Sequence, residues 1–299
     1  MLYHPSHHVT SLRHAEEFFE RVFGRPSTPL SALGHTSPES DYSTFTPIAD
    51  VLFDSIDPQR YRVGGVQRYP SIDRPALKGL GWYVPDTGAL FRSLQERGFG
   101  VVDQLDRAAR GDDPPTAAGS PMPLFFTTPE DAGLRYEFVP TFPFPLDPRL
   151  EHGWTLPPES EHDPLGIVRC AHHTVLSSQP ARALRLVVDV LGGEVVHEGH
   201  DEVLEATVTS VHLADAVLRV AVPDGGSAAQ AELRADEPND RYHSLTWQVV
   251  DLDRVEGHLR SEGVGIAART ETTLVAEAGT ALGIPWGFTT ERSPGDPRP

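Results

Sequence analysis

A strand-like segment that occurs twice is the feature that most constrains how this chain can fold. The first copy, GLGWYVPD, runs from Gly79 to Asp86, and the second, SLTWQVVD, runs from Ser244 to Asp251. Each copy leads into a segment with apolar residues at helical spacing. An internal duplication determines architecture before any single residue is considered, and it allows two related sites to be compared position by position.

Two earlier segments follow the same order of elements. A strand pattern at 2–10 precedes a helix pattern that ends with FFERVFG at 18–24, and a strand at 167–176 precedes a helix ending with LVVDVLG at 186–192. Glycine after the last apolar residue is a typical helix stop. Each of the four segments continues into two or three further strands. The sequence therefore predicts an α+β fold of four βαβββ units arranged as two tandem pairs.

Composition changes mark the expected boundaries between these pairs. Residues 140–164 are rich in proline and acidic residues and show little apolar periodicity, which is typical of a linker. We expect an N-terminal domain at 1–145, a linker at 146–166, a C-terminal domain at 167–292 and a disordered tail at 293–299. The Gly-, Pro- and Asp-rich stretch 106–123 is expected to form a long surface loop.

Charge and cysteine content exclude several classes of protein. The chain has 43 acidic and 25 basic residues and a net charge of -18, so we expect neither nucleic acid nor an anionic membrane as a partner. The single cysteine, Cys170, excludes an intramolecular disulfide and a cysteine-rich zinc module. No apolar run approaches the ~18 residues of a membrane span, and no signal-peptide pattern is present at the N-terminus. These features predict a cytoplasmic protein.

The repeated units resemble the vicinal oxygen chelate superfamily, which includes glyoxalases, bleomycin-resistance proteins and type I extradiol dioxygenases. The resemblance rests on a first strand with a histidine, the helix ending FFERVFG, the strand ending at Asp86, and Tyr136-Glu-Phe138. It covers nearly the whole chain, and four units in one chain are most similar to the two-domain extradiol dioxygenases. The resemblance implies that the four βαβββ units pair into two cup-shaped domains, with a divalent metal (Fe²⁺, Mn²⁺ or Zn²⁺) at the base of a cup. A histidine from each of two first strands and a glutamate from a last strand would hold it.

The implied ligand positions can be transferred to this chain residue by residue. In the first pair they fall on His4, on Gly79 (seven residues before Asp86) and on Glu137. The first cup therefore keeps two of three ligands.

In the second pair the implied positions fall on His172, Ser244 and Gly287. His243 would face inward only if a β-bulge rotated it. The metal ligands predicted from the resemblance are therefore His4, Glu137 and His172, and a hydrogen-bonded pair without metal remains the alternative for His4 and Glu137.

Other histidines are candidates for supporting roles. His8, His35 or an acidic residue of the first unit could supply a third ligand to the first cup, although His8 lies ~13 Å along the strand from His4. We expect His8 in the first cup and His243 in the second to move protons, and we expect His7 and His14 to be solvated.

Four aromatic residues occupy matching places in the repeats, namely Trp82, Tyr136, Trp247 and Trp286. They are candidates for binding an aromatic substrate. Core packing is the alternative, and it is favoured for Trp82 and Trp247.

The leading functional hypothesis is a metal-dependent dioxygenase, lyase or isomerase acting on a small oxygenated, perhaps aromatic, substrate. A metal-free binding or resistance protein and a metal-independent acid–base enzyme are the alternatives, and a homodimer is left open. Hydrolase, nucleotide-binding and zincin motifs are absent from the sequence.

Overall fold

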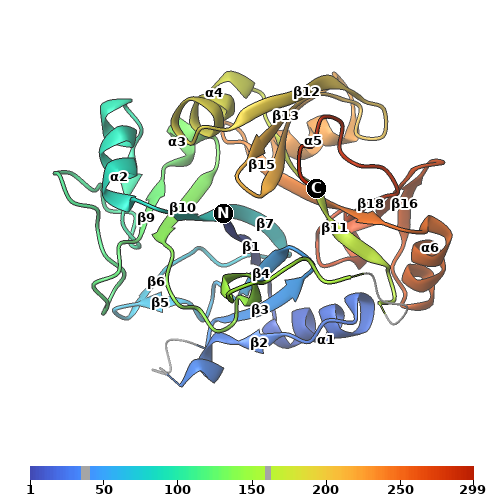
Figure 1. The fold of residues 1–299 in the computed structure, drawn as a ribbon, viewed down its shortest axis with the longest axis horizontal. Coiled ribbons are helices and arrows are strands. Elements are labelled where there is room, and N and C mark those ends of the chain that lie inside the picture. The colour runs from blue at the N-terminus through green and yellow to red at the C-terminus, as the bar shows by residue number, and fades with distance from the viewer. Residues whose placement is uncertain (35–40, 159–162) are drawn as a thin grey trace.

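The computed structural model describes residues 1–34, 41–158 and 163–299. Their strands form two mixed eight-stranded sheets and a small hairpin. The four units predicted from the sequence are present, each with the order strand, helix, three strands. The fold is therefore α+β, as predicted (Figure 1).

The first sheet contains units one and two. Unit one comprises β1 (Leu2–His8), α1 (Leu12–Phe23), β2 (Thr28–Pro29), the 3₁₀ turn η1 (Leu30–Leu33), β3 (Ser43–Ile48) and β4 (Val51–Ile56). The hairpin of β5 (Arg62–Val63) and β6 (Val66–Gln67) follows. Unit two comprises β7 (Ala76–Val84), α2 (Thr87–Glu96), β8 (Val101–Val102), β9 (Phe125–Thr127), α3 (Pro129–Ala132) and β10 (Arg135–Pro140).

The second sheet contains units three and four. After the turn η3 (Pro148–Leu150), unit three comprises β11 (Ile167–Leu176), α4 (Pro180–Leu184) with its π-helical continuation η4 (Arg185–Val190), β12 (Glu194–Asp201), β13 (Ala206–Leu213) and β14 (Ala216–Pro223). Helix α5 (Ala228–Arg234) precedes unit four. Unit four comprises β15 (Arg241–Val249), α6 (Leu252–Ser261), β16 (Ile266–Arg269), β17 (Thr273–Ala276), η5 (Ala278–Thr280) and β18 (Gly287–Thr289).

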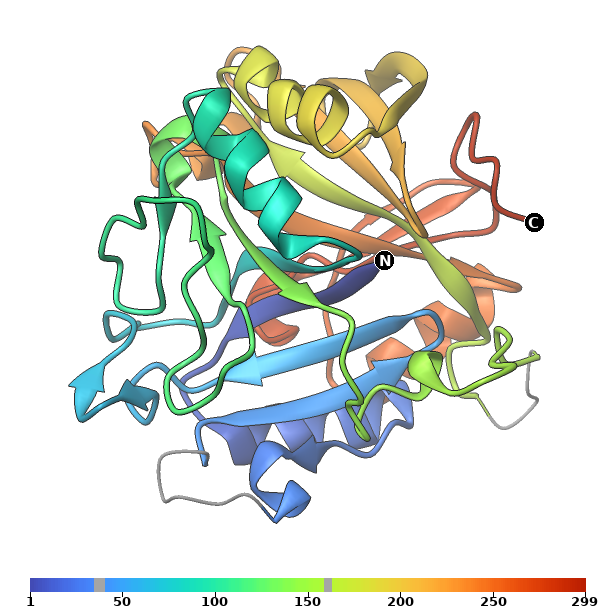
Figure 2. The same cartoon turned by 60° about the vertical axis from the view of Figure 1, so that its left-hand side comes forward.

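Both sheets have the same strand order. The first runs β2-β3-β4-β1-β7-β10-β9-β8 and the second runs β12-β13-β14-β11-β15-β18-β17-β16. In each sheet the first strands of two units meet in the middle as an antiparallel pair, β1 with β7 and β11 with β15. The duplication seen in the sequence is therefore a duplication of the whole sheet, visible in Figure 2 as two curved layers.

Local signals explain where the repeated helices begin and end. Asp86 caps α2 by accepting a hydrogen bond from the backbone of Ala89, and Asp251 caps α6 in the same way. Gly24 ends α1 with φ +64°, a left-handed conformation that glycine adopts readily. These are the residues that the repeat pattern placed at helix ends.

A shared apolar core joins the two sheets. Phe19 and Phe23 of α1 pack against Trp286 of the second half, with the rings of Phe23 and Trp286 only 4.9 Å apart. Trp247 lies on the same cluster, 6.3 Å from Trp286. Helix α1 therefore buries its apolar face partly against the other half of the chain.

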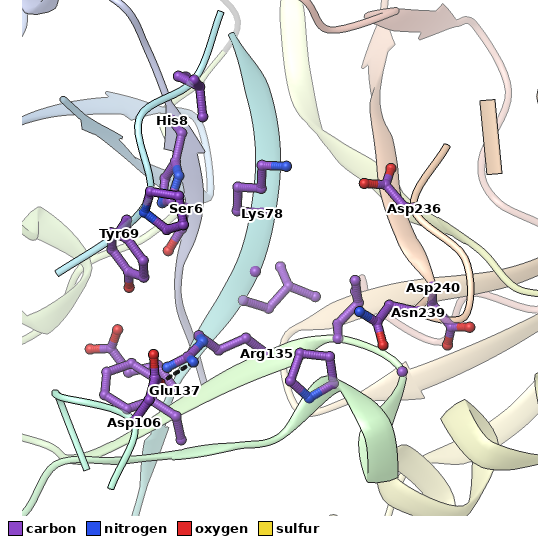
Figure 3. A pocket seen from close by; sticks show the side chains of 18 residues that line it. Ser6, His8, Tyr69, Lys78, Asp106, Arg135, Glu137, Asp236, Asn239 and Asp240 are labelled. Atoms are coloured by element: carbon purple, nitrogen blue, oxygen red, sulfur yellow. Dashed lines mark hydrogen bonds and ion pairs between the residues drawn. The ribbon is translucent and has the colours of Figure 1, made fainter. Parts of the chain in front are cut away.

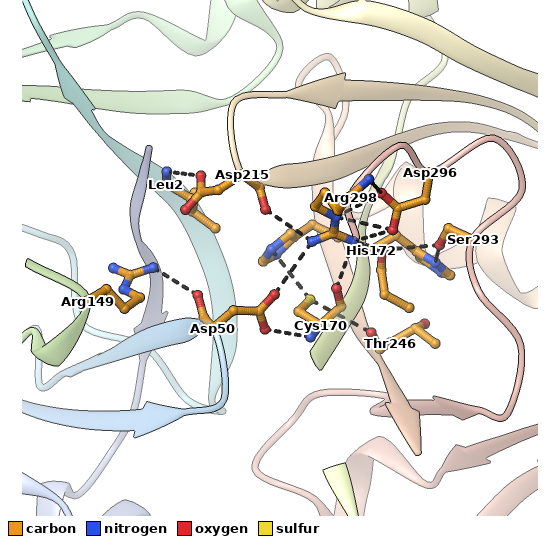
Figure 4. A network of polar contacts seen from close by, with 12 residues as sticks. Leu2, Asp50, Arg149, Cys170, His172, Asp215, Thr246, Ser293, Asp296 and Arg298 are labelled. Atoms are coloured by element: carbon orange, nitrogen blue, oxygen red, sulfur yellow. Dashed lines mark hydrogen bonds and ion pairs between the residues drawn. The ribbon is translucent and has the colours of Figure 1, made fainter. Parts of the chain in front are cut away.

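The C-terminal segment is ordered, and the expectation of a disordered tail is wrong. Arg298 donates hydrogen bonds to the carbonyls of Cys170, Ala171 and Asp215 and lies 3.5 Å from the carboxylate of Asp50 (Figure 4). Because one guanidinium satisfies three carbonyl groups and a carboxylate, it anchors an otherwise irregular segment.

Among the described residues, no helix has the length and apolar character needed to cross a membrane.

Candidate functional site

The floor of the first cup is formed where β1, β7 and β10 lie side by side. His4 of β1 pairs with Gly81 of β7, and Gly81 also pairs with Glu137 of β10. His4 is only 3% exposed. Its Nε2 atom lies 3.9 Å from a carboxylate oxygen of Glu137. The two residues singled out from the sequence are therefore brought together.

The strand register shows which residue lies opposite the first-strand histidine in each cup. The residue opposite His4 is Gly81 rather than Gly79, and the residue opposite His172 is Thr246 rather than Ser244. In the first sheet, the pairing shifts at Tyr3, which has no partner of its own on β7. Counting residues back from a helix cap cannot detect such an irregularity.

A second carboxylate near His4 is Asp54 of β4, one of the acidic residues of the first unit that sequence reasoning considered as a group and did not single out. It is 6% exposed, and one of its oxygens lies 4.0 Å from Nδ1 of His4. The hydroxyl of Ser43 donates a hydrogen bond to it. The available signal was an aspartate inside the mainly apolar strand VLFDSI. A buried carboxylate is rare in proteins unless it is paired or hydrogen-bonded.

Burial shifts the protonation of all three groups. It raises the pKa of Asp54 to about 8, with Glu137 adding to the rise, and it raises the pKa of Glu137 to about 7. Arg68 and Arg135 oppose the rise at Glu137. Burial lowers the pKa of His4 to about 3, so its imidazole is neutral at pH 7. No positive charge of the described part of the chain therefore lies between Asp54 and Glu137, because the imidazole between them is neutral.

The geometry decides which of these groups could share a metal ion. Asp54 faces Nδ1 of His4 and Glu137 faces Nε2, so one ion cannot bind all three groups. The donors that fit are His4 Nε2 and Glu137, with Asp54 placed to orient the imidazole. A Cβ at Gly81 would lie 3.0 Å from His4 Nε2, so glycine keeps this nitrogen accessible.

Within residues 1–34, 41–158 and 163–299, no three His, Cys, Asp or Glu side chains are grouped as ligands of one ion. The first cup therefore offers two protein donors of the right chemistry, an imidazole nitrogen and a carboxylate, for Fe²⁺, Mn²⁺ or Zn²⁺.

Glu137 opens onto a cavity of about 330 Å³, called cavity 1 here (Figure 3). His8, the predicted proton carrier, lines the same cavity and packs against Tyr69 at a ring distance of 4.5 Å. Burial, with Lys78 as the next contributor, lowers the pKa of His8 to about 3. His8 is thus a neutral imidazole that faces the same space as Glu137.

The remaining histidines of the first unit differ in their surroundings. His7 is fully buried and its Nε2 atom contacts the carbonyl of Leu282 at 2.9 Å, so the expectation that it is solvated is wrong. The two halves pack together at this point, which the sequence did not reveal. His14 is exposed, as expected. His35 lies outside the described residues.

The second cup has the same backbone but a different floor. His172 pairs with Thr246, and Thr246 pairs with Gly287. Nη1 of Arg219 donates to Nε2 of His172 at 2.9 Å, and Nδ1 of His172 lies 2.9 Å from the hydroxyl of Ser293. Both nitrogens of His172 therefore have partners within the protein, an arrangement that does not favour the predicted metal there.

The bulge that would turn His243 inward is present. Thr174 pairs with Ser244 and Val175 pairs with Tyr242, which leaves His243 without a partner on β11. His243 lines a cavity of about 410 Å³, called cavity 2, together with His172. Its Nδ1 atom contacts the hydroxyl of Ser244 at 3.0 Å. Burial lowers the pKa of His243 to about 4.

The four predicted substrate-binding aromatics lie in the core. Trp82, Tyr136, Trp247 and Trp286 are each at most 3% exposed, and none lines cavity 1 or cavity 2. Strand alternation explains three of these positions. Trp82 follows Gly81, Tyr136 precedes Glu137, and Trp247 follows Thr246, so each points away from its cup. These four aromatic residues therefore pack in the core, which was the alternative to substrate binding.

Comparison with known proteins concerns the fold. No family model and no curated protein matches the chain. A solved variant of 4-hydroxymandelate synthase from Streptomyces coelicolor is similar over 96% of this chain and 91% of that one, with 14% identity and a TM-score of 0.62. The 2,3-dioxygenase LapB from Pseudomonas sp. KL28 is similar over 99% and 93%, with 12% identity and a TM-score of 0.60.

A Mn(II)-bound glyoxalase from Novosphingobium aromaticivorans is similar over 98% of this chain and 83% of that one, with 13% identity and a TM-score of 0.56. At such identities the likeness establishes architecture and leaves the reaction open. With its four βαβββ units and duplicated sheet, the chain has the vicinal oxygen chelate fold over nearly its whole length.

Proposed function

We propose that this protein is a metal-dependent enzyme that acts on a small oxygenated substrate in the first cup. The observation that carries the proposal is the pairing of His4 Nε2 with Glu137 at 3.9 Å on the cup floor. The Mn(II)-bound glyoxalase of similar fold supports a divalent metal as the cofactor. The candidate reactions are those of a dioxygenase, a lyase or an isomerase, because each is accelerated when negative charge on a substrate oxygen is stabilised.

The residues around the pair have distinct roles in this proposal. His4 presents a neutral Nε2 lone pair, and the carboxyl of Asp54 at 4.0 Å from Nδ1 orients the ring. Glu137 supplies the anionic donor at the end of cavity 1. A divalent ion bound there would polarise two neighbouring oxygens of the substrate.

Proton transfer is assigned to His8. Its imidazole is neutral, lines cavity 1 beside Glu137, and is held against the ring of Tyr69. The neutral form is the one that can accept a proton from a bound substrate, and its pKa of about 3 makes it a weaker base than Glu137.

A metal-independent acid–base enzyme is the second candidate, and one observation favours it. The pKa of Glu137 is raised to about 7, which is the range in which a carboxylate is an effective general base at neutral pH. In that case the carboxylate would itself take the proton, with Arg135 stabilising the anionic product.

Metal content measured by mass spectrometry on protein purified without chelator or nickel distinguishes these candidates. We expect about one Fe, Mn or Zn ion per chain in the parent, a loss in His4→Ala and Glu137→Gln, and no change in the matched control His172→Ala. A parent protein that takes up no ion after anaerobic loading with Fe²⁺ would overturn the metal-dependent proposal. Activity retained in that protein would support the acid–base enzyme, and ligand binding without turnover a binding protein.

A further inference from the structure

We propose that the substrate of the first cup is a small aromatic carboxylate, and that Lys78 and Arg135 bind its carboxylate in cavity 1. This inference rests on the proposed function, because it assumes that catalysis takes place in this cup. It adds the chemical class of the substrate and two residues that select it.

Lys78 is the only lysine in the chain, and a strand irregularity directs it into cavity 1. Ser6 pairs with Gly79 and His7 pairs with Leu77, so Lys78 is left without a partner on β1. This is the position that His243 occupies in the second sheet. Figure 3 shows the ammonium group reaching into the space between the two walls of the cavity, and no ion pair joins it to a described residue.

Two arginines beside the cavity have unused donors. Nη1 of Arg135 and the Nε and Nη2 atoms of Arg68 are buried without a hydrogen-bond partner among the described residues. The two guanidinium groups share a single carboxylate, Asp106, which contacts Arg68 at 2.9 Å and also Arg135. Buried donors without partners lower stability unless a ligand satisfies them, so these guanidinium groups favour an added acceptor in cavity 1.

Two further acidic residues of the lining are already paired with arginines outside it. Asp236 is paired with Arg241 at 2.5 Å, and Asp240 is paired with Arg182 at 2.7 Å. Lys78, Arg68 and Arg135 then remain as three cations against the two carboxylates of Asp106 and Glu137. In a chain with a net charge of -18, this local excess of one cation would attract an anion into cavity 1.

The shape of the cavity indicates which anion. A planar carboxylate matches the fork of an arginine, whereas a dianionic phosphate would be repelled more strongly by the nearby carboxylates of Asp106 and Glu137. The rings of Tyr69 and Phe126 form part of the wall, with the guanidinium groups of Arg68 and Arg135 over them. Together with Leu80 and Leu134 they offer an apolar surface to an aromatic body. The volume of about 330 Å³ lies at the lower end of the range for small-molecule sites.

The single lysine makes a direct test available. Reductive methylation with ¹³C-formaldehyde labels only Lys78 and the N-terminal amine of Met1, and it preserves their positive charge. We would titrate the labelled protein with salicylate and with its neutral isostere salicylamide, and follow the two methyl signals by NMR. We expect salicylate to shift the Lys78 signal saturably, salicylamide to leave it in place, and the Met1 signal to stay unchanged.

Calorimetric titration of unlabelled variants provides the second readout. We expect Lys78→Gln and Arg135→Gln each to weaken salicylate binding roughly tenfold, which corresponds to the loss of one charge-assisted contact. Arg13→Gln, which removes a cation at an exposed site on α1, should bind as the parent does. Equal binding of the two isosteres, or absence of salicylate binding to the parent, would overturn the inference.

The metal measurement keeps this failure separate from failure of the proposed function. A protein that binds metal through His4 but does not prefer salicylate would retain the proposed function and lose the carboxylate inference. A protein that binds no metal but still prefers salicylate through Lys78 would retain the carboxylate inference and lose the metal-dependent function.

Discussion

The two cups share a backbone but differ in the charge of their floors. Both keep the histidine of the first strand, His4 in one and His172 in the other. Around it, Asp54 corresponds to Arg219, Gly81 to Thr246, and Glu137 to Gly287. The first cup therefore surrounds its histidine with carboxylates, whereas the second places a guanidinium 2.9 Å from it.

This difference shows that the histidine alone does not determine what a cup can bind. In the first cup, an added cation would stabilise the two buried carboxyl groups. In the second cup the protein itself supplies a cation, Arg219, which is paired with Asp201 at 2.9 Å. The duplicated floors thus differ in one respect. The histidine of the first floor faces two carboxyl groups, and the histidine of the second floor contacts an arginine that is itself paired with an aspartate.

The largest effect is expected from rebuilding the first floor in the second cup. The combined variant Arg219→Asp, Thr246→Gly, Gly287→Glu should gain about one bound divalent ion per chain, measured as Mn²⁺ bound at equilibrium. The change at Thr246 is necessary because a Cβ at Gly287 would lie 2.3 Å from its hydroxyl oxygen.

Thr246→Gly alone serves as the control for this rebuilding and should bind no additional ion. If the combined variant folds and binds no more Mn²⁺ than the control does, the charge of the floor is not what separates the two cups.

A second effect concerns stability and pH. The pKa of Asp54 is raised to about 8, so between pH 4 and pH 8 the folded metal-free protein holds more protons than the unfolded chain. The free energy of unfolding should therefore fall as pH rises through this window. Asp54→Asn should remove much of that fall and stabilise the metal-free protein at pH 8 by on the order of 2–5 kcal/mol.

Urea unfolding of metal-free parent and variant at pH 5 and pH 8 measures this effect. The substitution Asp201→Asn in the second cup is the comparison, because Asp201 is paired with Arg219, and its removal should destabilise rather than stabilise. An Asp54→Asn protein with the same pH dependence as the parent would show that this carboxyl is not strained by burial.

The smallest effect is expected at the glycine opposite His4. Gly81→Ala places a Cβ 3.0 Å from His4 Nε2, so metal affinity should fall roughly tenfold while the fold is kept. Thr246→Ala, the matched change in the second cup, should leave it unaltered. Metal titration of both variants and the parent measures this effect. If Gly81→Ala binds metal as tightly as Thr246→Ala does, Gly81 has no role in metal binding.

Sequence reasoning reached His4 and Glu137, because the family resemblance gives both positions and they lie close to well-marked helix and strand ends. It left Asp54 among the unnamed acidic residues of the first unit, because the strand of Asp54 carries no repeat motif. It did not reach Gly81, because the residue opposite His4 is set by strand register. Trp286, which the pattern offered as a ligand platform, packs against α1 because the two halves share a core.

The amino-acid sequence by itself determined the number and order of the units, their helix ends and the duplication of the sheet. These features depend on local periodicity, capping residues and glycine stops, all of which can be seen within one segment of chain. Only the tertiary structure decided which side chains share a floor and which cations face cavity 1. Those relations depend on strand register and on bulges at Tyr3, Lys78 and His243, where a single unpaired residue changes which side chains meet across neighbouring strands.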